Sequence, residues 1–469
     1  MDKRLERILP RVQKPARYVG GEYNAVKKDP AQVDTRIAFC FPDTYEIGMS
    51  NLGMRILYGV MNNMDGVWCQ RVFAPWGDME EEMRRAGMPL FALESGEPIT
   101  DFDIVAFSVG YEMAFPAILN MLDLAGIPIH SAERTGLTPL VIAGGTAMYN
   151  AEPIADFIDL VSLGEGEDIT VELVELHRKA RREGWSKMQF LRAAAQLPGI
   201  YVPSLYEVTY HDDGTVAEIT PLEGAPAVVT KRIVHDMDKS FFPTQTIVPS
   251  TEIVQDRVML ELFRGCIRGC RFCQAGYVYR PVRNRSEALC AQYAVESCDG
   301  SGYQEVTLSS LSTSDYPPLT QLCDQLEDFC QQRHVNLSLP SLRADNFSMN
   351  LMERLAKGRK SGLTFAPEAG GIRGVAGPEG CGGGRHRPEP HRPHAPLQPR
   401  HLHQSLQRHT QSFCRHAGGQ GPWLRAGALL LQHPWRPVRG LLRRRSAEDR
   451  DALSGGRVRP LRGVPRQAL

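Results

Sequence analysis

Three cysteines with a short, regular spacing are the residues of this chain best suited to chemistry. Cys266, Cys270 and Cys273 form a Cys-x3-Cys-x2-Cys pattern within the stretch ELFRGCIRGCRFCQAG. Structural zinc sites and closed iron–sulfur clusters usually take four protein ligands, so three thiolates leave one iron of a four-iron cluster without a protein ligand. An open iron can bind a substrate or cofactor directly. The spacing therefore predicts a reactive metal centre.

The residues around the cysteines favour a loop wrapped around such a centre. The apolar run 258–263 predicts a buried strand, and Gly265 and Gly269 allow tight turns after it. Three arginines in the same stretch favour thiolates over thiols and offset the charge of a cluster: Arg264, Arg268 and Arg271. The alternatives are three reduced cysteines without a metal and a zinc site with a distant fourth ligand. Strand, glycines and arginines together favour the cluster.

With an aromatic residue before its third cysteine, this loop resembles that of the radical SAM superfamily. Other stretches resemble an uncharacterised family of radical SAM proteins that has an N-terminal cobalamin-binding-like domain. These stretches are PDTYEIGMSNLGMRILY at 42–58, IAGGTAMYNAEPIADFIDLVSLGEGE at 142–167 and FAPEAG at 365–370. The resemblance covers roughly residues 10–370 and implies no particular substrate.

The resemblance implies an enzyme that binds a [4Fe-4S] cluster through the three cysteines and S-adenosylmethionine at the open iron. One electron from the cluster would split the sulfonium and give a 5′-deoxyadenosyl radical, which abstracts hydrogen from an unknown substrate. A flavodoxin- or ferredoxin-like protein would supply the electron.

Six residues that flank the cysteines or follow predicted strands are candidates for holding the cofactor, because parallel barrels place their chemistry at the carboxyl ends of strands. They are Phe272, Ser309, Asp315, Ser341, Arg343 and Glu368. Phe272 would shield the adenine side of the loop, or else pack in the core. The segment 309–315 departs from the Gly-Gly-Glu-like form usual in the superfamily. Its hydroxyls and Asp315 would substitute at the methionine amine, or else cap the next helix.

The two candidates that follow the third strand suit the methionine carboxylate. Arg343 can pair with it bidentately and Ser341 can hydrogen-bond nearby; the alternative is a salt bridge at the barrel rim. Glu368, after the fourth strand, would accept hydrogen bonds from the ribose hydroxyls or the amine.

Short strands that alternate with helical patterns predict an α/β fold. After an extension at 1–30, residues 31–200 predict a doubly wound, Rossmann-like domain with strands at 36–41, 104–109, 139–143 and 157–162, and helices at 48–64, 116–125 and 168–182. Residues 201–250 predict a β-rich connector with a hairpin of strands 206–210 and 216–220. Residues 251–370 predict the first part of a radical SAM (β/α) barrel, with strands at 258–263, 305–308, 335–339 and 363–366 and helices at 287–298, 318–332 and 350–357.

Two glycine-containing turns follow strands of the first domain, at 144–146 and 164–167, where a cobalamin or nucleotide could approach closely. The Asp-x-His-x-x-Gly element that supplies an axial histidine to cobalamin is absent, and the surroundings of His130 do not match it. We therefore favour a domain that keeps the cobalamin-binding fold without the cofactor.

The composition changes abruptly after Gly370. The chain has 54 basic and 54 acidic residues, but residues 371–469 hold 18 arginines, no lysine and 5 acidic residues, with 8 of the 13 histidines. No helix or strand period is visible there, and we interpret this tail as out-of-frame translation that leaves the barrel incomplete and impairs activity. The alternatives are a non-catalytic iron–sulfur or zinc module with a basic, nucleic-acid-binding tail, and an inactive frame-shifted product. Nucleic-acid binding is disfavoured.

The remaining features predict a cytoplasmic protein without a membrane segment. The chain of 469 residues contains no apolar run long enough for a membrane helix and no secretory start. Eleven cysteines without a small secreted framework fit a reducing compartment. Outside the metal loop and the tail, we expect the cysteines to pack in the core: Cys40, Cys69, Cys290, Cys298, Cys323 and Cys330.

Overall fold

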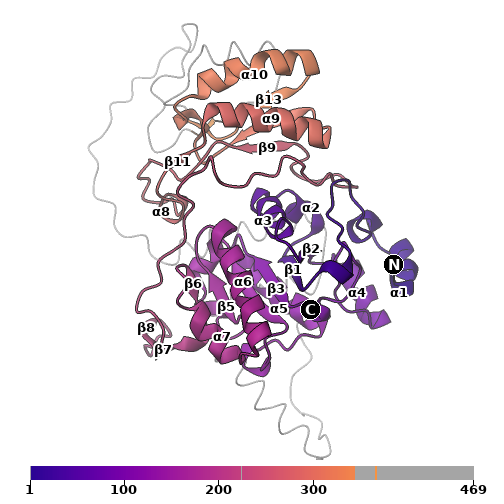
Figure 1. Ribbon diagram of the computed structural model, residues 1–469, viewed down its shortest axis with the longest axis vertical. Helices are drawn as coiled ribbons and strands as arrows, with labels where there is room; N and C mark the ends of the chain where they lie inside the picture. Colours follow the sequence, from indigo (N-terminus) through magenta and orange to yellow (C-terminus); the bar gives the residue numbers. More distant parts are fainter. Residues whose placement is uncertain (1, 223, 344–364, 367–469) are drawn as a thin grey trace, which may run out of the picture. The chain divides into compact units, whose positions relative to one another are not determined.

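The computed structural model describes residues 2–222, 224–343 and 365–366. A six-stranded sheet with the order β2-β1-β3-β4-β5-β6 occupies its N-terminal part (Figure 1). The strands are β1 (Thr35–Phe41), β2 (Val67–Phe73), β3 (Ile104–Ser108), β4 (Leu140–Gly144), β5 (Leu160–Ser162) and β6 (Ile200–Tyr201). The first five are parallel, and β6 runs antiparallel to β5. The predicted parallel α/β sheet is confirmed.

Helices pack in two groups around this sheet. Helix α3 (Leu52–Asn62) contacts α6 (Gly166–Glu183), whereas α4 (Gly77–Ala86) is bonded to α5 (Phe115–Ala125) through Arg84 Nη1 and Asp123 Oδ2, 2.8 Å apart. Smaller helices complete the region: α1 (Lys3–Ile8), α2 (Tyr45–Met49) and α7 (Lys187–Ala194). Because β1 lies between β2 and β3, the winding reverses there, which is where sheets of this kind bind ligands.

Several details of the N-terminal prediction were wrong. The helix expected at 48–64 is two helices, α2 and α3, because the Asn51 side chain accepts a hydrogen bond from the Met54 N–H at 2.9 Å and starts α3 afresh. Strand β2 was missed, since Gln70 and Arg71 interrupt its apolar pattern although all seven residues are buried. Strand β5 is shorter than the run 157–162 and begins at Leu160.

The connector contains the expected hairpin. Strands β7 (Tyr206–Tyr210) and β8 (Val216–Pro221) pair in antiparallel register, with an irregularity between Thr209 and Tyr210. The Asp-Gly turn signal between the two runs was therefore interpreted correctly.

A second, three-stranded parallel sheet carries the C-terminal described region. Its order is β13-β12-β9, with β9 (Val258–Glu261), β12 (Glu305–Ser309) and β13 (Asn336–Ser338). Helices α9 (Glu287–Ser301) and α10 (Leu319–Arg333) connect these strands, as the predicted βα repeats require. The fourth expected strand is placed differently: β15 (Phe365–Ala366) pairs in parallel with β14 (Leu342–Arg343), not with β13. The helix expected at 350–357 and the tail 371–469 lie outside the described residues.

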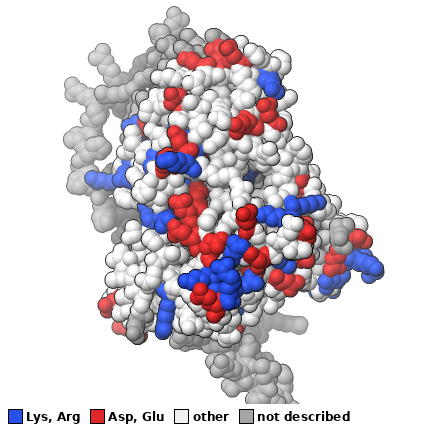
Figure 2. Space-filling model, viewed as in Figure 1, with Lys and Arg blue, Asp and Glu red and all other residues white. Residues whose placement is uncertain are grey.

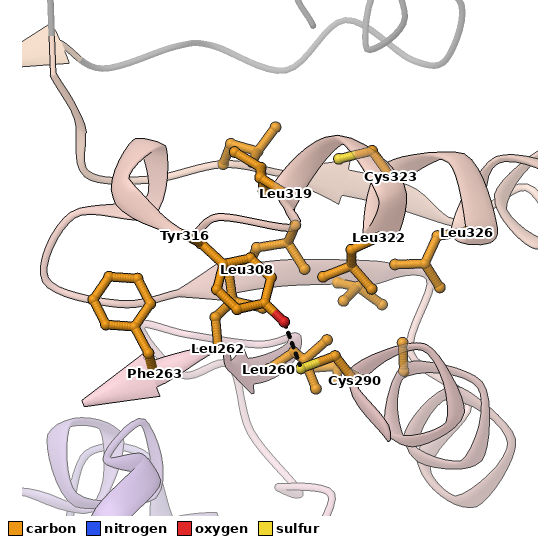
Figure 3. Packing of buried hydrophobic residues seen from close by; sticks show 14 of the residues in the cluster. Leu260, Leu262, Phe263, Cys290, Leu308, Tyr316, Leu319, Leu322, Cys323 and Leu326 are labelled. Atoms are coloured by element: carbon orange, nitrogen blue, oxygen red, sulfur yellow. Dashed lines mark hydrogen bonds between the residues drawn. The ribbon is translucent and has the colours of Figure 1, made fainter. Parts of the chain in front are cut away.

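Leucines from strands and helices form the core beneath this second sheet (Figure 3). Leu260 and Leu308 from the strands meet Leu322 and Leu326 of α10, all nearly inaccessible to solvent. Tyr316 closes one end, where its hydroxyl donates to the Arg285 carbonyl at 2.7 Å and lies 3.9 Å from the Cys290 sulfur. This packing holds the carboxyl ends of β9 and β12 side by side.

The cysteines outside the metal loop pack as expected in the described region. Cys330 is half-buried. The other five are buried: Cys40, Cys69, Cys290, Cys298 and Cys323. Burial raises the pKa of the Cys290 thiol to about 11, which keeps it protonated. These cysteines are therefore core residues, not further metal ligands.

Charged side chains of both signs are interspersed on the face shown in Figure 2. Many are paired; Arg84, for example, lies within 2.9 Å of Glu80 and 2.8 Å of Asp123. Among the residues whose placement is described, no helix is both long and apolar enough to span a bilayer.

Candidate metal centre

The cysteine loop leaves the second sheet at the end of β9 and returns through a short antiparallel ladder. Strands β10 (Phe263–Arg264) and β11 (Arg283–Asn284) pair Phe263 with Asn284 and Arg264 with Arg283. The run 258–263 is thus not one strand: it divides at Leu262, where the chain passes from the parallel sheet to the loop's base. The ladder brings the two ends of the loop together, which no local pattern had indicated.

Gly265 makes the turn into the loop. Its φ is +89°, in the region that favours glycine, and a Cβ at this position would lie 2.5 Å from the Pro281 carbonyl oxygen. Gly269 differs, because a Cβ there would have no atom within 4 Å. Only the first of the two predicted loop glycines is therefore required by close packing.

The three cysteines lie on partly exposed backbone inside this base. Cys273 N–H donates to the Cys270 carbonyl at 3.1 Å, and Arg280 donates to the carbonyls of Cys266 and Arg268 at 3.4 and 2.8 Å. All three thiols are free and half-buried. Nowhere in the described ranges do three His, Cys, Asp or Glu side chains converge as metal ligands, so binding requires the three thiols to be drawn together.

The donor set itself fits an iron–sulfur cluster. Three thiolates without a carboxylate among them are soft ligands, which select iron–sulfur clusters or zinc rather than magnesium or calcium. The guanidinium of Arg280 binds the loop backbone and places positive charge beside it, whereas that of Arg268, within the loop, is paired with Asp315. The residues present therefore match the group that the spacing predicts.

Asp315 ties the cysteine loop to the segment that follows β12. Its carboxylate accepts from Arg268 Nε at 3.0 Å and from the Ser312 hydroxyl at 2.7 Å, and its side chain is 5% exposed. It does not cap α10, which begins at Leu319 without a side-chain cap. Of the two roles that the sequence left open for Asp315, the helix cap is therefore wrong.

The segment around β14 lies beside the same turn. Ser341, at φ +59°, accepts a hydrogen bond from Thr313 N–H through its carbonyl at 3.2 Å. Arg343 N–H lies 3.4 Å from the Ser314 hydroxyl. Backbone contacts thus bring Asp315, Ser341 and Arg343 to one region next to the cysteine loop.

The other predicted cofactor residues are placed differently. Ser309 ends β12, where its carbonyl accepts from Leu262 N–H at 3.0 Å, directly before the loop. Phe272 is 78% exposed, so the alternative of core packing is wrong and its ring faces solvent. Glu368 lies outside the described residues.

Sequence reasoning missed the acidic partners of the loop's base. Glu165 and Glu167, at the start of α6, contact Arg264 and Arg283 of the ladder. The turn 164–167 was noted for its glycines alone. The two glutamates after a predicted strand and the two arginines were each visible in the sequence. No local pattern connected them, because they are far apart along the chain.

The two glycine turns of the N-terminal domain are packed against the chain itself. A Cβ at Gly145 would lie 2.4 Å from the Val109 carbonyl oxygen, and one at Gly164 would lie 2.1 Å from that of Arg232. The space that a side chain would fill at each glycine is therefore taken by backbone atoms of the chain itself.

Residues 53–203 match the family described as radical SAM proteins, N-terminal. The resemblance to radical SAM proteins is confirmed. The match covers α3 to the end of the six-stranded sheet, so it concerns the domain that precedes the cysteine loop.

A curated relative extends the similarity across the loop. An uncharacterised protein of Methanocaldococcus jannaschii is 28% identical over 340 residues, which cover 72% of this chain and 61% of the relative. The chain thus matches about three fifths of that protein's length.

Three solved structures are distantly similar. Two are of the radical S-adenosylmethionine methyltransferase TsrM from Kitasatospora setae, one with tryptophan substrate and a SAM analogue, the other with cobalamin and a [4Fe-4S] cluster. Their TM-scores are 0.46 and 0.43, at 14% sequence identity. Each similarity covers 71% of this chain, and 59% and 58% of the respective TsrM chains. The third, the cobalamin-dependent radical enzyme OxsB, has a TM-score of 0.46 at 13% identity, over 71% of this chain and 44% of its own. Likenesses this distant carry no weight for what this chain binds.

Proposed function

We propose that this chain is a radical SAM enzyme in which Cys266, Cys270 and Cys273 hold a [4Fe-4S] cluster and S-adenosylmethionine binds the open iron. The observation that carries the proposal is the position of the cysteine loop. It emerges at the carboxyl end of β9 and is joined to the segment after β12 by the Arg268–Asp315 ion pair. Carboxyl ends of parallel strands are where such folds place their chemistry.

The described residues have distinct tasks in this proposal. Arg280 holds the loop backbone through two carbonyls, and Arg268 fixes it to Asp315. Arg343, held beside the same turn, would bind the methionine carboxylate, for which its planar guanidinium is well shaped. When bound, the cluster would supply the electron that cleaves the sulfonium and starts radical chemistry on a substrate still to be identified, with a flavodoxin- or ferredoxin-like donor.

Anaerobic reconstitution tests the proposal. We expect about four irons and four sulfides per chain, as for a [4Fe-4S] cluster, with a paramagnetic signal after reduction that changes when S-adenosylmethionine is added. Reduced protein should then release 5′-deoxyadenosine. One bound zinc without iron would instead identify the non-catalytic module, and iron without any response to S-adenosylmethionine would exclude the enzyme.

A pair of cysteine variants supplies the control. Cys270→Ala should lose most of the iron, because two thiolates hold a cluster poorly. Cys330→Ala, which changes a half-buried cysteine on α10, should keep the iron content of the parent. Equal iron in both variants would show that the loop does not bind the metal.

A further inference from the structure

Two arginines face each other at the base of the cysteine loop. The β10–β11 ladder pairs Arg264 directly with Arg283, so their side chains leave the same face of the two strands. Like charges opposite one another destabilise a strand pair. Both side chains are also largely withdrawn from water, at 11% and 8% exposure, which strengthens their repulsion. This ladder therefore needs negative charge beside it.

Glu165, from the turn between β5 and α6, provides that charge for both arginines. Its carboxylate takes a bidentate pair from Arg283, with Nη1–Oε2 at 2.6 Å and Nη2–Oε1 at 2.7 Å. Arg264 Nη1 lies 3.5 Å from the same carboxylate. The side chain of Glu165 is itself only 11% exposed. One acidic residue of the N-terminal domain thus bridges the two strands that close the loop.

Glu167 and Glu261 complete the neutralisation. Arg264 Nη2 lies 2.6 Å from Glu167 Oε1, and its Nε lies 2.9 Å from Glu261 Oε1. Burial lowers the pKa of Arg264, but Glu261 and Glu167 raise it more, so the guanidinium stays charged. Burial likewise raises the pKa of Glu165, but Arg283, Arg264 and the Val234 N–H together outweigh it and leave this pKa below its ordinary value. Three carboxylates thus surround the two guanidinium groups of the ladder.

The acidic turn is held in place by its own backbone contacts. Glu165 N–H donates to the Arg232 carbonyl at 2.9 Å, and Val234 N–H donates to Glu165 Oε2 at 2.6 Å. Lys231, next in the connector, donates to the carbonyls of Val278 and Arg280 at 2.7 and 2.6 Å, on the returning side of the loop. The N-terminal domain and its connector thus bind both ends of the loop through ion pairs and hydrogen bonds.

We propose that Glu165 and Glu167 are positioning residues for the metal centre: they keep Arg264 and Arg283 paired and so hold closed the base of the loop that carries the three cysteines. This inference rests on the proposed function for the identity of the metal centre. It adds that the first domain is part of the apparatus that assembles the centre. Cys266 follows Arg264 by two positions, so an opened ladder displaces the first ligand most.

Limited proteolysis of the metal-free protein tests this without any cofactor. Trypsin can cut the loop after Arg268 and after Arg271, of which Arg271 is exposed. We expect Glu165→Gln to speed cleavage at these two positions by about tenfold, since opening of the loop sets the rate of cutting. The matched control is Glu175→Gln, on the same helix α6, whose pair with Arg178 is exposed; its loop should be cut at the parent rate.

A second readout follows the reconstituted protein. Release of iron to a chelator should be about tenfold faster from Glu165→Gln than from the parent, as is usual when residues that support metal ligands are changed. Glu165→Asp, which restores the charge, should recover part of the retention. If Glu165→Gln does not fold, Arg283→Lys replaces it, because lysine keeps the charge but loses the bidentate fork.

The outcomes separate the two proposals. Unchanged rates of loop cleavage and iron release in Glu165→Gln and Arg283→Lys would overturn the positioning role while leaving the metal centre intact. A parent protein that binds no iron would overturn the proposed function, and the proteolysis of the metal-free chain would still decide whether the acidic turn closes the loop.

Discussion

Arg268, between the first two cysteines, forms an ion pair with Asp315, which follows β12: Nε lies 3.0 Å from Oδ2. The Ser312 hydroxyl donates to the same oxygen at 2.7 Å. The contact joins two segments that the sequence proposed separately for cluster and cofactor binding. It implies that Asp315 orders the cysteine loop, whether or not it also meets the cofactor.

The Arg268–Asp315 contact predicts coupled mutational effects. Asp315→Asn and Arg268→Gln should each lower the free energy of unfolding by about 1–3 kcal/mol, as expected for a hydrogen bond to a charged group that is partly buried. The double variant should lose little more than either single variant, because both changes remove one contact. Urea unfolding of the metal-free protein measures this, and strictly additive losses would contradict the coupling.

Binding of S-adenosylmethionine to the same variants separates the two roles of Asp315. If the carboxylate acts through Arg268 alone, both single variants of the reconstituted protein should weaken cofactor binding to the same degree in calorimetry. A loss confined to Asp315→Asn would assign the carboxylate to the cofactor itself.

The two glycines of the cysteine loop should tolerate alanine very differently. Gly265→Ala forces a side chain into a conformation at φ +89° and against the Pro281 carbonyl, so we expect a loss of about 1–3 kcal/mol in stability and lower iron content. Gly269→Ala meets no atom within 4 Å and should resemble the parent. Thermal unfolding and iron analysis compare them; equal behaviour would show that the turn at Gly265 is not required.

A buried ion-pair cluster around β2 should be costly to break. Arg71 on β2 lies 2.8 Å from Glu22 Oε2 and 2.7 Å from Glu94 Oε1, with all three side chains at most 2% exposed. Arg71→Met should cost about 3–5 kcal/mol, because it leaves the buried carboxylates of Glu22 and Glu94 without a cation. Glu81→Gln, which breaks an exposed pair with Arg85, should cost less than about 1 kcal/mol in the same urea titration. A small loss in Arg71→Met would mean that water reaches the carboxylates of Glu22 and Glu94.

His177 predicts a loss of stability in mild acid. This side chain of α6 is fully buried, its Nε2 lies 3.3 Å from the Leu137 carbonyl, and its Nδ1 has no partner in the described structure. Burial lowers its pKa below the ordinary 6.5. Its contribution to stability is therefore complete above pH 6.5 and declines as the pH falls from there towards the lower folded pKa, because only the unfolded chain binds the proton.

The variant His177→Gln, which can still donate to the Leu137 carbonyl, should remove this part of the pH dependence. The measurement is the free energy of unfolding at several pH values on both sides of 6.5, compared between the two proteins. Parallel curves would show that His177 is not the group responsible.

Local sequence patterns correctly predicted the elements that are specified by neighbouring residues. The run at 36–41 and the helix at 168–182 are found with small shifts, as β1 and α6. The hairpin β7–β8 is also found, because an Asp-Gly turn brings neighbouring runs together without help from the rest of the fold. The helix expected at 48–64 failed for a local reason that was visible, the capping asparagine at 51.

Strand β2 was missed because its stability is not local. Arg71 argues against a buried strand until its two carboxylate partners are known, and these lie 49 and 23 positions away in the chain. The hydrophobic pattern of the surrounding residues gives no indication of such distant partners. The order of the strands, with β1 between β2 and β3, is likewise a property of the packed sheet.

For the candidate metal centre, the sequence by itself predicted the type and number of ligands, because Cys266, Cys270 and Cys273 are close together along the chain. It also predicted that a strand precedes this loop, and β9 does so. Only the tertiary structure decided what closes the loop: a ladder that sets Arg264 opposite Arg283, with Glu165 from the turn between β5 and α6 between them. The physical reason is that the spacing of the cysteines is a property of residues close together in the sequence. The neutralisation of buried charge depends on side chains that are distant in the sequence and meet only in the folded protein.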